Sequence, residues 1–442
     1  MQNFCKNDSK IMLISFSIEN FLSIKELQTL SFEANSDKHL ESINVFLHQK
    51  HRLLRASAVY GPNASGKSNL MRAMAWMRDF VIGSSKEGQV EAKIGVTPFA
   101  LSSETENKPS YFEIRFFIQE IQYRYGFQVD DRKIHAEWLF RRRPEAKEVR
   151  LFTRKKDEFS ISPDHFNEGI GLQKRTRPNA LFLSVCSQFN GQVASDILRW
   201  MRRFRFSGRS IDRTFFYYTA GRLGDPKSRG RIIDMARHAD LGICDLSGTV
   251  KELEIPASIS ETITEEFKKR LLAQKVGFPE IKVHHWKYGA DNSKQEQVQF
   301  DLEDLESKGT QRFIALAGPI CLALDEGSVF VVDEFESMLH PLLSRAIVSL
   351  FLGPQNSNNA QLLFATHDTL LMDPDLMRRD QIWFTNKDEY GATSLFSLAE
   401  FDSKKVRASS KFNRQYLMGI FGAIPNICLD LTESASANDK EV

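Results

Sequence analysis

The chain has 442 residues, enough for two lobes or one large interrupted domain, and its hydrophobic fraction of 42% suffices for a sizeable core. Its 59 basic and 57 acidic side chains nearly cancel to a formal net charge of +2, which excludes a chain-wide attraction to nucleic acid. The five cysteines form no C-x-x-C pair and no run of about 18 apolar residues occurs, which excludes a disulfide scaffold and a membrane-spanning helix. We therefore expect a cytoplasmic protein with reduced thiols and no membrane partner.

The first regular pattern lies close to the N-terminus. The stretch LISFSIENFLSI (13–24) begins with alternating apolar and polar side chains, which predicts a half-buried strand. We expect residues 1–11 to be a disordered leader, with Met12 as an alternative start, and the polar end at 431–442 to be a disordered tail.

The strongest motif follows a short apolar stretch, ASAVY, at 56–60. The next residues, GPNASGKS, match the pattern G-x-x-x-x-G-K-S in every fixed position, and apolar side chains recur behind them at helical spacing. A strand, a glycine-rich loop and a helix in this order form a phosphate-binding loop, whose N–H groups point at phosphate oxygens. The expected nucleotide-binding positions are Gly61, Pro62, Asn63, Ala64, Ser65, Gly66, Lys67, Ser68 and Asn69.

Two side chains of this loop have specific expected roles. The ammonium group of Lys67 would reach the β and γ phosphates of ATP, and the hydroxyl of Ser68 would ligate Mg²⁺. The alternative is a chance glycine-rich turn, which the strand before it and the helix after it disfavour.

An acidic pair ends a second buried strand. The stretch VFVVDE places Asp333 and Glu334 at the tip of a continuous apolar run, as expected for a strand covered on both faces. Asp333 would hold Mg²⁺ and Glu334 would orient or deprotonate the attacking water. The alternative is a strand that ends in two solvated carboxylates.

A third apolar run, QLLFATHD (361–368), ends in Thr366, His367 and Asp368. It follows the acidic pair by one strand, helix, strand interval, where a sensor of the γ-phosphate is needed. We expect His367 to be this sensor, and a purely structural histidine is the alternative.

The stretch SKGTQ (307–311) precedes the acidic strand, and Ser307 there is suited to cap a helix. The order of the motifs resembles the ABC-type ATPase head of SMC, RecF and MutS-like proteins, in which this position holds the signature loop LSGGQ. The resemblance implies that Ser307, Lys308, Gly309 and Gln311 contact ATP held by another subunit. Lys308 replaces a glycine, and either adds a cation near the transferred phosphoryl group or points to solvent.

The same resemblance implies an oligomer, a dimer or a higher assembly. Two heads would sandwich two ATP molecules and stay together only while ATP is intact, so the protein would be a switch with slow, regulatory hydrolysis.

Further stretches narrow the family. LISFSIENFLSI, YFEIRFFI, YRYGFQV, RPNALFLSVCSQFN, ADLGI, DEFESMLHP and QYLMGIFGAIP together resemble the RloA/AbiLi-type AAA ATPases and the AriA subunits of PARIS systems, from about residue 12 to 427. This resemblance implies an anti-phage, abortive-infection defence role. The ATPase would be a sensor and scaffold for a separately encoded effector, such as a TOPRIM-type nuclease, with DNA or a phage protein as trigger.

Two positions depart from the ABC pattern. His340 stands where ABC heads have an aspartate, and the following Pro341 indicates a helix start that His340 would cap. Gln188 is the candidate for the glutamine that senses Mg²⁺, because LFLSVCSQFN resembles a buried strand that ends in Gln188. The alternative for Gln188 is a helix-capping or solvent-facing amide.

The expected fold is an α/β ABC-type P-loop ATPase head, a mixed sheet flanked by helices, interrupted by a mostly helical insert. Its N-terminal lobe would span 12–190, the insert 191–285 and the C-terminal lobe 286–430.

Two segments are locally basic, at 132–156 and 198–213. Arginines interleaved with Trp200, Phe204 and Phe206 would suit phosphate contacts and base stacking. The alternative places the aromatic rings in a core and the arginines in solvent. A DNA-binding ATPase of RecF or SMC type is therefore the competing function.

Overall fold

A six-stranded sheet carries the three nucleotide motifs. The computed structural model describes residues 11–86, 91–207, 213–252, 277–402 and 411–425. The sheet order is β11-β15-β16-β5-β17-β18, and every neighbouring pair is parallel except β17 and β18. Its strands are β5 (Ala56–Tyr60), β11 (Arg205–Ser207), β15 (Val329–Val332), β16 (Gln361–Ala365), β17 (Ile382–Lys387) and β18 (Thr393–Ser397). The strands β5, β15 and β16 are fully buried, as their continuous apolar runs predict.

A second, antiparallel sheet has seven strands in the order β10-β9-β8-β7-β6-β1-β2. These strands are β1 (Ile11–Glu19), β2 (Gln28–Ser31), β6 (Ser110–Ile118), β7 (Ile121–Val129), β8 (Ile134–Arg142), β9 (Val149–Lys155) and β10 (Glu158–Ile161). The predicted first strand is confirmed, although it starts at Ile11. The strands β3 (Val45–His48) and β4 (His51–Leu54) form a small hairpin beside the sheet, and the short helix α1 (Glu41–Asn44) precedes it.

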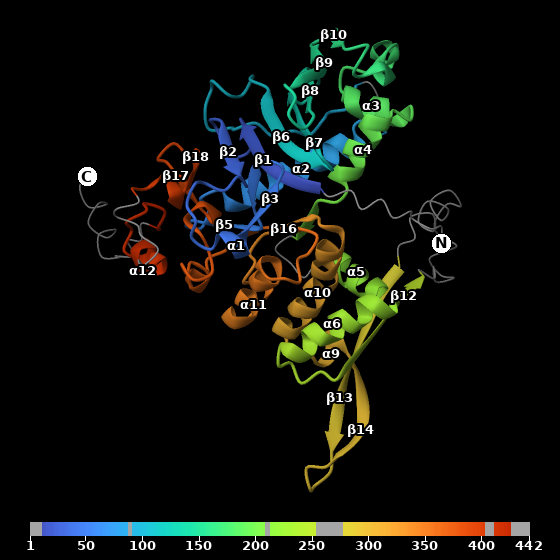
Figure 1. The fold of residues 1–442 in the computed structure, drawn as a ribbon, viewed down its shortest axis with the longest axis vertical. Helices are drawn as coiled ribbons and strands as arrows, with labels where there is room; N and C mark the ends of the chain where they lie inside the picture. Colours follow the sequence, from blue (N-terminus) through green and yellow to red (C-terminus); the bar gives the residue numbers. More distant parts are fainter. Residues whose placement is uncertain (1–10, 87–90, 208–212, 253–276, 403–410, 426–442) are drawn as a thin grey trace, which may run out of the picture.

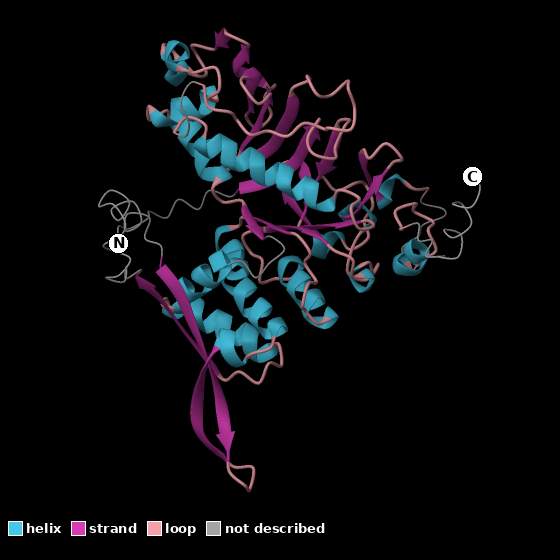
Figure 2. Ribbon diagram, turned by 180° about the vertical axis from the view of Figure 1, so that it is seen from behind, coloured by secondary structure: helices cyan, strands magenta, loops and turns pink. Residues whose placement is uncertain are grey.

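Helix α2 (Lys67–Gly83) lies between the two sheets (Figure 2). Its buried side chains, Leu70, Met71, Met74 and Met77 among them, belong to one core with both sheets. The spacing of these residues predicted this helix. Helices α3 (Phe182–Gln188) and α4 (Gln192–Met201) pack beside it. The apolar stripe of α2 therefore anchors the start of the helix, where the phosphate-binding loop ends, inside the core.

The other face of the six-stranded sheet packs on a second group of helices (Figure 1). They are α5 (Arg213–Leu223), α6 (Pro226–His238), α10 (Lys308–Glu326), α11 (Pro341–Leu352) and α12 (Phe412–Leu417). The molecule is thus layered as sheet, helices, sheet and helices. The predicted α/β fold with a mixed sheet flanked by helices is confirmed, and an insert interrupts it. Within the described residues, no helix combines the length and the apolar character needed to cross a bilayer.

The insert contains a sheet as well as helices. Strands β12 (Asp245–Glu252), β13 (Gly277–Tyr288) and β14 (Lys294–Asp301) form a three-stranded antiparallel sheet, and the short helix α9 (Leu302–Leu305) connects it to α10. The far part of β13 and β14 projects from the molecule as an arm (Figure 1). The stretch SETITEEFKKRLLAQ (260–274), expected to be helical within the insert, lies outside the described residues.

Both expected boundaries of the insert fall inside packed units. Helix α4 follows residue 191 but packs on α3 and α2, and β11 then joins the six-stranded sheet. The second boundary, between residues 285 and 286, divides strand β13. The physical reason is that Trp200 and its apolar neighbours complete the core around α2, so the chain leaves the head only after Ser207.

The expected strand before Gln188 is wrong, because residues 182–188 form helix α3. A continuous apolar run suits either a buried strand or a buried helix, so its pattern does not decide. The carboxylate of Glu137, on β8, favours the helix here. It accepts hydrogen bonds from the backbone N–H groups of Phe182 and Leu183, at 2.7 and 3.0 Å. These are N–H groups at the start of a helix, which need such a partner.

Short 3-10 helices complete the described chain, at Asn167–Gly169, Leu172–Arg175, Thr369–Leu371, Arg379–Gln381 and Leu398–Glu400. The expectation of buried, reduced thiols holds for Cys186 and Cys321, which are free and buried. Burial raises the pKa of Cys321 to about 11, so this thiol stays protonated at neutral pH.

Candidate functional site

The phosphate-binding loop requires glycine at both of its fixed glycine positions. Gly61 and Gly66 have φ angles of +150° and +111°, which side chains of L-residues rarely allow. A Cβ atom at Gly61 would lie 2.3 Å from the carbonyl oxygen of Thr385, and one at Gly66 would lie 2.3 Å from Oγ1 of Thr393. The loop is therefore pressed against β17 and β18 as it turns from β5 into α2.

A chain of hydroxyl groups holds the loop in this shape. Oγ of Ser65 lies 2.6 Å from Oγ1 of Thr385, and Oγ1 of Thr393 donates to the carbonyl oxygen of Ser65 at 2.9 Å. Oγ of Ser23 lies 2.7 Å from Oγ1 of Thr393 and accepts a hydrogen bond from the amide of Asn69, also at 2.7 Å. Residues from two distant parts of the chain, Ser23 and the pair Thr385 and Thr393, thus fix the loop.

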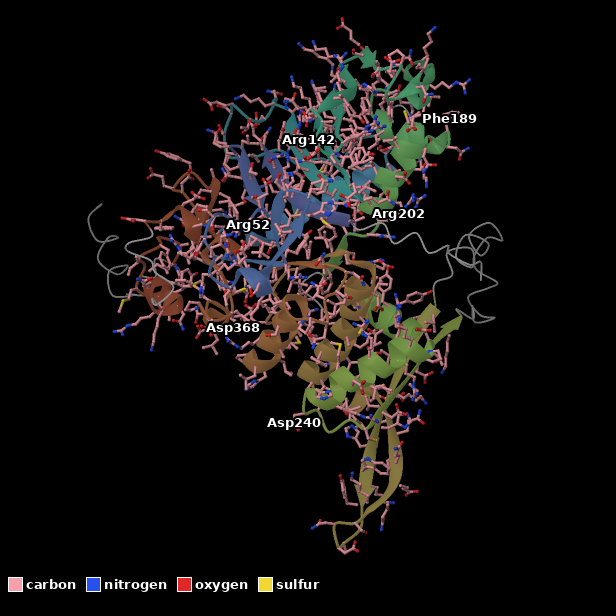
Figure 3. The ribbon with its side chains drawn as sticks, viewed as in Figure 1. Arg52, Arg142, Phe189, Arg202, Asp240 and Asp368 are labelled. Atoms are coloured by element: carbon pink, nitrogen blue, oxygen red, sulfur yellow. The ribbon has the colours of Figure 1, made fainter. Side chains whose placement is uncertain are left out.

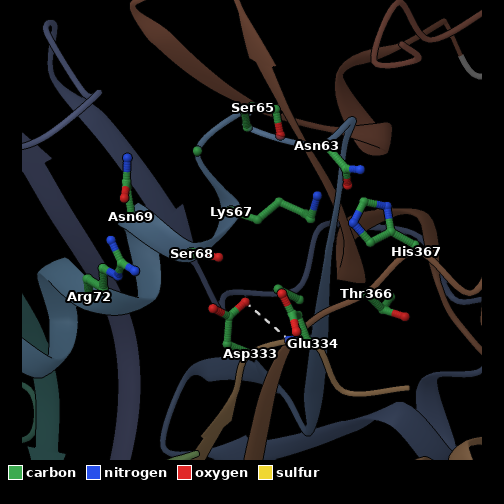
Figure 4. Close-up of a pocket in the computed structure, with 13 residues that line it drawn as sticks. Asn63, Ser65, Lys67, Ser68, Asn69, Arg72, Asp333, Glu334, Thr366 and His367 are labelled. Atoms are coloured by element: carbon green, nitrogen blue, oxygen red, sulfur yellow. Dashed lines mark hydrogen bonds between the residues drawn. The ribbon is translucent and has the colours of Figure 1, made fainter. Parts of the chain in front are cut away.

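The three motifs line one cavity of about 430 Å³ (Figure 4). The carboxyl ends of β5, β15 and β16 meet here with the first turn of α2, whose N-terminal dipole end favours anions. The lining residues are Asn63, Ala64, Ser65, Gly66, Lys67, Ser68, Asn69, Arg72, Asp333, Glu334, Ala365, Thr366 and His367.

Lys67 is directed into the cavity, toward His367 (Figure 4). Its Nζ atom donates hydrogen bonds to the carbonyl oxygens of Gly61 and Pro62, at 2.7 and 3.0 Å. These carbonyl groups keep the ammonium at the mouth of the loop.

The acidic pair leaves β15 in a strained turn. Asp333 is 8% exposed, and its Oδ1 accepts the backbone N–H of Glu334 at 3.1 Å. Glu334 has a φ of +49°, which is unusual for a residue other than glycine and costs about 1 kcal/mol or more. In this backbone conformation the two carboxylates lie side by side and face the cavity. Asp333 lies below Ser68 in Figure 4.

The residues present fit a magnesium ion bound together with a nucleotide. The hydroxyl of Ser68 and the carboxylate of Asp333 are oxygen donors on the same cavity, and Mg²⁺ prefers one or two such donors plus phosphates and water. No cluster of three or more His, Cys, Asp or Glu residues able to hold a metal by itself occurs in the described part of the chain. Bound there, Mg²⁺ would neutralise charge on the β and γ phosphates.

His367 lines the same cavity as the acidic pair. Its backbone N–H donates to Oε1 of Glu336 at 2.7 Å. Partial burial and then the nearby ammonium of Lys67 lower the pKa of His367, while the carboxylates of Glu336, Glu334 and Asp333 oppose this. The imidazole is therefore neutral at pH 7 before an anion binds.

The expected signature residues lie at the start of α10, outside this cavity. Ser307 caps the helix, as predicted, because its Oγ accepts the backbone N–H of Thr310 at 3.1 Å. Lys308 donates to Oε1 of Gln311 at 3.1 Å. The structure therefore separates Ser307, Lys308, Gly309 and Gln311 from the phosphate-binding loop of the same chain.

Gly309 and Gln311 connect this turn to its neighbours. A Cβ atom at Gly309 would lie 2.7 Å from the carbonyl oxygen of Met338, so glycine is needed for a backbone contact within the chain. Nε2 of Gln311 donates to the carbonyl oxygens of Glu303 and Glu306, both at 3.0 Å.

The prediction that His340 caps a helix is confirmed. Its Nδ1 accepts the backbone N–H of Leu342 at 3.2 Å, and Pro341 is the first residue of α11.

Gln188 is not part of the site. It is an exposed residue at the end of α3 and does not line the cavity. The expectation that it senses Mg²⁺ depended on the strand that the structure replaces with a helix, and the solvent-facing alternative is correct.

Three lining residues, Arg72, Ala365 and Thr366, were missed from the sequence. Arg72 lies one helical turn after Ser68, on the same face of α2, and the spacing of four residues could have identified it. Thr366 was noted only as the end of a strand, but it lines the cavity, and its Oγ1 accepts the backbone N–H of Asp368 at 3.0 Å.

The aromatic residues of the second basic segment belong to a core. Trp200 is 1% exposed and stacks on Phe116 with ring centroids 4.0 Å apart, and Phe204 is also buried. Only Phe206 is partly exposed, and the guanidinium of Arg78 covers its ring.

The sequence matches the family model described as "AAA domain, putative AbiEii toxin, Type IV TA system" over residues 56–373. The match covers more than half of the chain and includes all three cavity motifs. The chain belongs to this AAA ATPase family. No curated protein sequence gives a significant match.

Solved structures with a similar course of the chain include SMC heads. The SMC head domain from Thermotoga maritima is 16% identical, with a TM-score of 0.38, and the match covers 87% of this chain and 98% of that one. An SMC head bound to the C-terminal winged-helix domain of ScpA is 12% identical, with a TM-score of 0.42, over 89% and 99%. The Pyrococcus furiosus SMC head with an extended coiled coil is 11% identical, with a TM-score of 0.38, over 93% and 100%.

Proposed function

We propose that this protein binds and hydrolyses Mg·ATP in the cavity between the phosphate-binding loop and the acidic pair. One observation carries the proposal: Lys67 and Ser68, the pair Asp333 and Glu334, and His367 come from three separate segments and line a single cavity. Each of these side chains has the chemistry that phosphoryl transfer to water requires.

The roles follow from the positions. Lys67 exchanges the carbonyl oxygens of its own loop for phosphate oxygens. Glu334 accepts a proton from the attacking water or orients it, and the ring of His367 donates a hydrogen bond to the γ-phosphate. Asp333 and Ser68 would hold Mg²⁺ bound with the nucleotide.

Hydrolysis would act as a switch between two assembly states. The signature turn at Ser307 lies outside the cavity of its own chain, which supports a role on ATP held by a second subunit. Two heads that share two ATP molecules would separate after hydrolysis, because the contacts through the γ-phosphate are then lost. Turnover would accordingly be slow and regulatory.

The cellular role we propose is that of a sensor and scaffold in bacterial anti-phage defence. The motifs resemble RloA/AbiLi-type ATPases and AriA subunits, and the description of the matched family names a toxin–antitoxin system, in which two products act as a pair. The protein would hold a separately encoded effector, such as a TOPRIM-type nuclease, in the cytoplasm until DNA or a phage protein signals infection.

The test is recovery of the complex from the native host. Glu334→Gln should trap ATP and retain a stoichiometric partner protein, and Lys67→Ala should lose both. A bare protein that carries no partner in either variant would contradict the scaffold role.

A DNA-binding ATPase remains the second candidate, because one basic segment is largely exposed. Its exposed side chains are Arg132, Lys133, Arg142 (labelled in Figure 3), Arg143, Lys147, Arg150, Lys155 and Lys156. ATP hydrolysis that duplex DNA stimulates, with a steep loss of affinity as salt rises, would favour this function over the scaffold.

A further inference from the structure

The loop after β15 turns back sharply toward the neighbouring strand β16. Glu334 has a φ of +49°, and the next residue, Phe335, donates its backbone N–H to the carbonyl oxygen of Ala365 at 2.9 Å. This turn ties the two loops together one residue after the proposed catalytic base. It also directs Glu336 toward the segment that holds His367.

The carboxylate of Glu336 bonds directly to that segment. Its Oε1 accepts the backbone N–H of His367 at 2.7 Å, a short bond of the charge-assisted kind. Its Oε2 is buried and has no hydrogen-bond partner among the described residues. A carboxylate oxygen left in this state is unfavourable, so stability alone does not explain why an acid occupies the position.

The described residues support neither an ion pair nor a nucleotide contact as the role of Glu336. No ion pair between Glu336 and a basic side chain occurs in the described ranges. The residue does not line the cavity, so it is not placed to touch a nucleotide. The bond to His367 is what remains.

We propose that Glu336 is a positioning residue for His367. By fixing the peptide of His367 it sets where the imidazole stands at the Lys67 end of the cavity. The effect of Glu336 on turnover rests on the proposed ATP hydrolysis, whereas its effect on the ring of His367 does not.

The first test separates turnover from binding. Glu336→Ala should lower kcat about tenfold, as expected for one lost hydrogen bond of about 1.4 kcal/mol, with KM and ATP affinity changed less than about twofold. Glu336→Gln keeps an oxygen that can accept the N–H group, so it should retain most of the activity. In a His367→Ala background, Glu336→Ala should cause no further loss.

A matched control uses Glu400, which also accepts a backbone N–H at 2.7 Å, from Ser397, a residue that does not line the cavity. Glu400→Ala should leave kcat unchanged. The proposal is wrong if Glu336→Ala turns over ATP at the wild-type rate. It is also wrong if the double variant turns over about tenfold more slowly than His367→Ala alone.

A second readout does not depend on hydrolysis. With ¹⁵N-labelled histidine, the ring signals of His367 in the nucleotide-free protein should shift or broaden in Glu336→Ala and stay in place in Glu336→Gln and Glu400→Ala. Unchanged ring signals in Glu336→Ala would overturn the inference. A wild-type protein without turnover would instead refute the proposed function, and the ring signals would still decide the role of Glu336.

Discussion

The hydroxyl group of Thr393 donates a hydrogen bond to the carbonyl oxygen of Ser65 across 2.9 Å, although the two residues lie 328 positions apart in the chain. Ser65 belongs to the phosphate-binding loop and Thr393 to β18, the antiparallel edge of the six-stranded sheet. The shape of the loop is thus set by a strand that carries no nucleotide motif. Changes in β18 should therefore reach the nucleotide.

Replacing Thr393 with valine keeps the shape of the side chain and removes its hydroxyl. The carbonyl oxygen of Ser65 then loses its buried donor, at a cost of about 1–3 kcal/mol. We expect the loop to loosen and ATP to bind roughly tenfold more weakly, as titration calorimetry would measure. Thr393→Ser restores the hydroxyl and should bind ATP as the wild type does. Equal affinity of the valine and serine variants would contradict this account.

Gly309→Ala should slow ATP hydrolysis, because the added methyl group would collide with the backbone of the same chain. The added Cβ would lie 2.7 Å from the carbonyl oxygen of Met338, so the loop that carries Glu334 must move. We expect turnover to fall about tenfold or more, with ATP affinity nearly unchanged, in parallel assays of phosphate release and binding.

The control is Gly230→Ala, in α6, where an added Cβ meets no atom within 4 Å. The free energy of unfolding should rise by about 0.5–1 kcal/mol, because alanine favours a helix over glycine. Turnover of this variant should match the wild type. If Gly309→Ala also turns over normally, the contact with Met338 is not restrictive.

Lys67→Ala should raise the pKa of His367. Partial burial is the largest cause that lowers this pKa, and the charge of Lys67 is the next. Removing the ammonium takes away the second cause, so protonation of the ring begins at higher pH. An NMR titration of the ring signals should show a midpoint below 6.5 in the wild type and a higher one in the variant. Lys93→Ala, outside the cavity, should not move the midpoint, and a downward shift in Lys67→Ala would refute the charge interaction.

Glu137→Ala should destabilise the antiparallel lobe without touching the cavity. The buried carboxylate accepts hydrogen bonds from the hydroxyl of Tyr125 and from two N–H groups at the start of α3. Its loss leaves these donors unpaired and the buried Arg154 without its nearby negative charge, at a cost of about 3–5 kcal/mol. Urea unfolding measures this change. A loss below about 1 kcal/mol would show that the lobe relaxes around the missing group.

The sequence predicted the parts of the site whose chemistry depends on short contiguous segments. A phosphate-binding loop needs its glycines, lysine and serine at fixed spacing, so Gly61 to Ser68 were recognisable without a fold. Asp333 and His367 were found because each ends an apolar run, and parallel strands bring their carboxyl ends to one edge.

Residues that act through tertiary contacts were not predictable in this way. Nothing near Thr393 or Glu336 in the sequence indicates their bonds to Ser65 and His367. The prediction for Gln188 was wrong for a related reason, since the carboxylate of Glu137, 45 positions before Phe182, stabilises a helix where the local pattern allowed a strand. The insert boundary was misplaced because β13 pairs with β12, and pairing between distant strands is not encoded by a local period.

The most direct test of the central claim is phosphate release by the full chain at saturating Mg·ATP, measured beside equilibrium ATP binding for the wild type, Lys67→Ala and Glu334→Gln. The account predicts slow turnover by the wild type, at least about 100-fold less by Glu334→Gln with ATP still bound, and loss of binding by Lys67→Ala. Turnover by Glu334→Gln at the wild-type rate, or ATP binding that does not depend on Lys67, would contradict it.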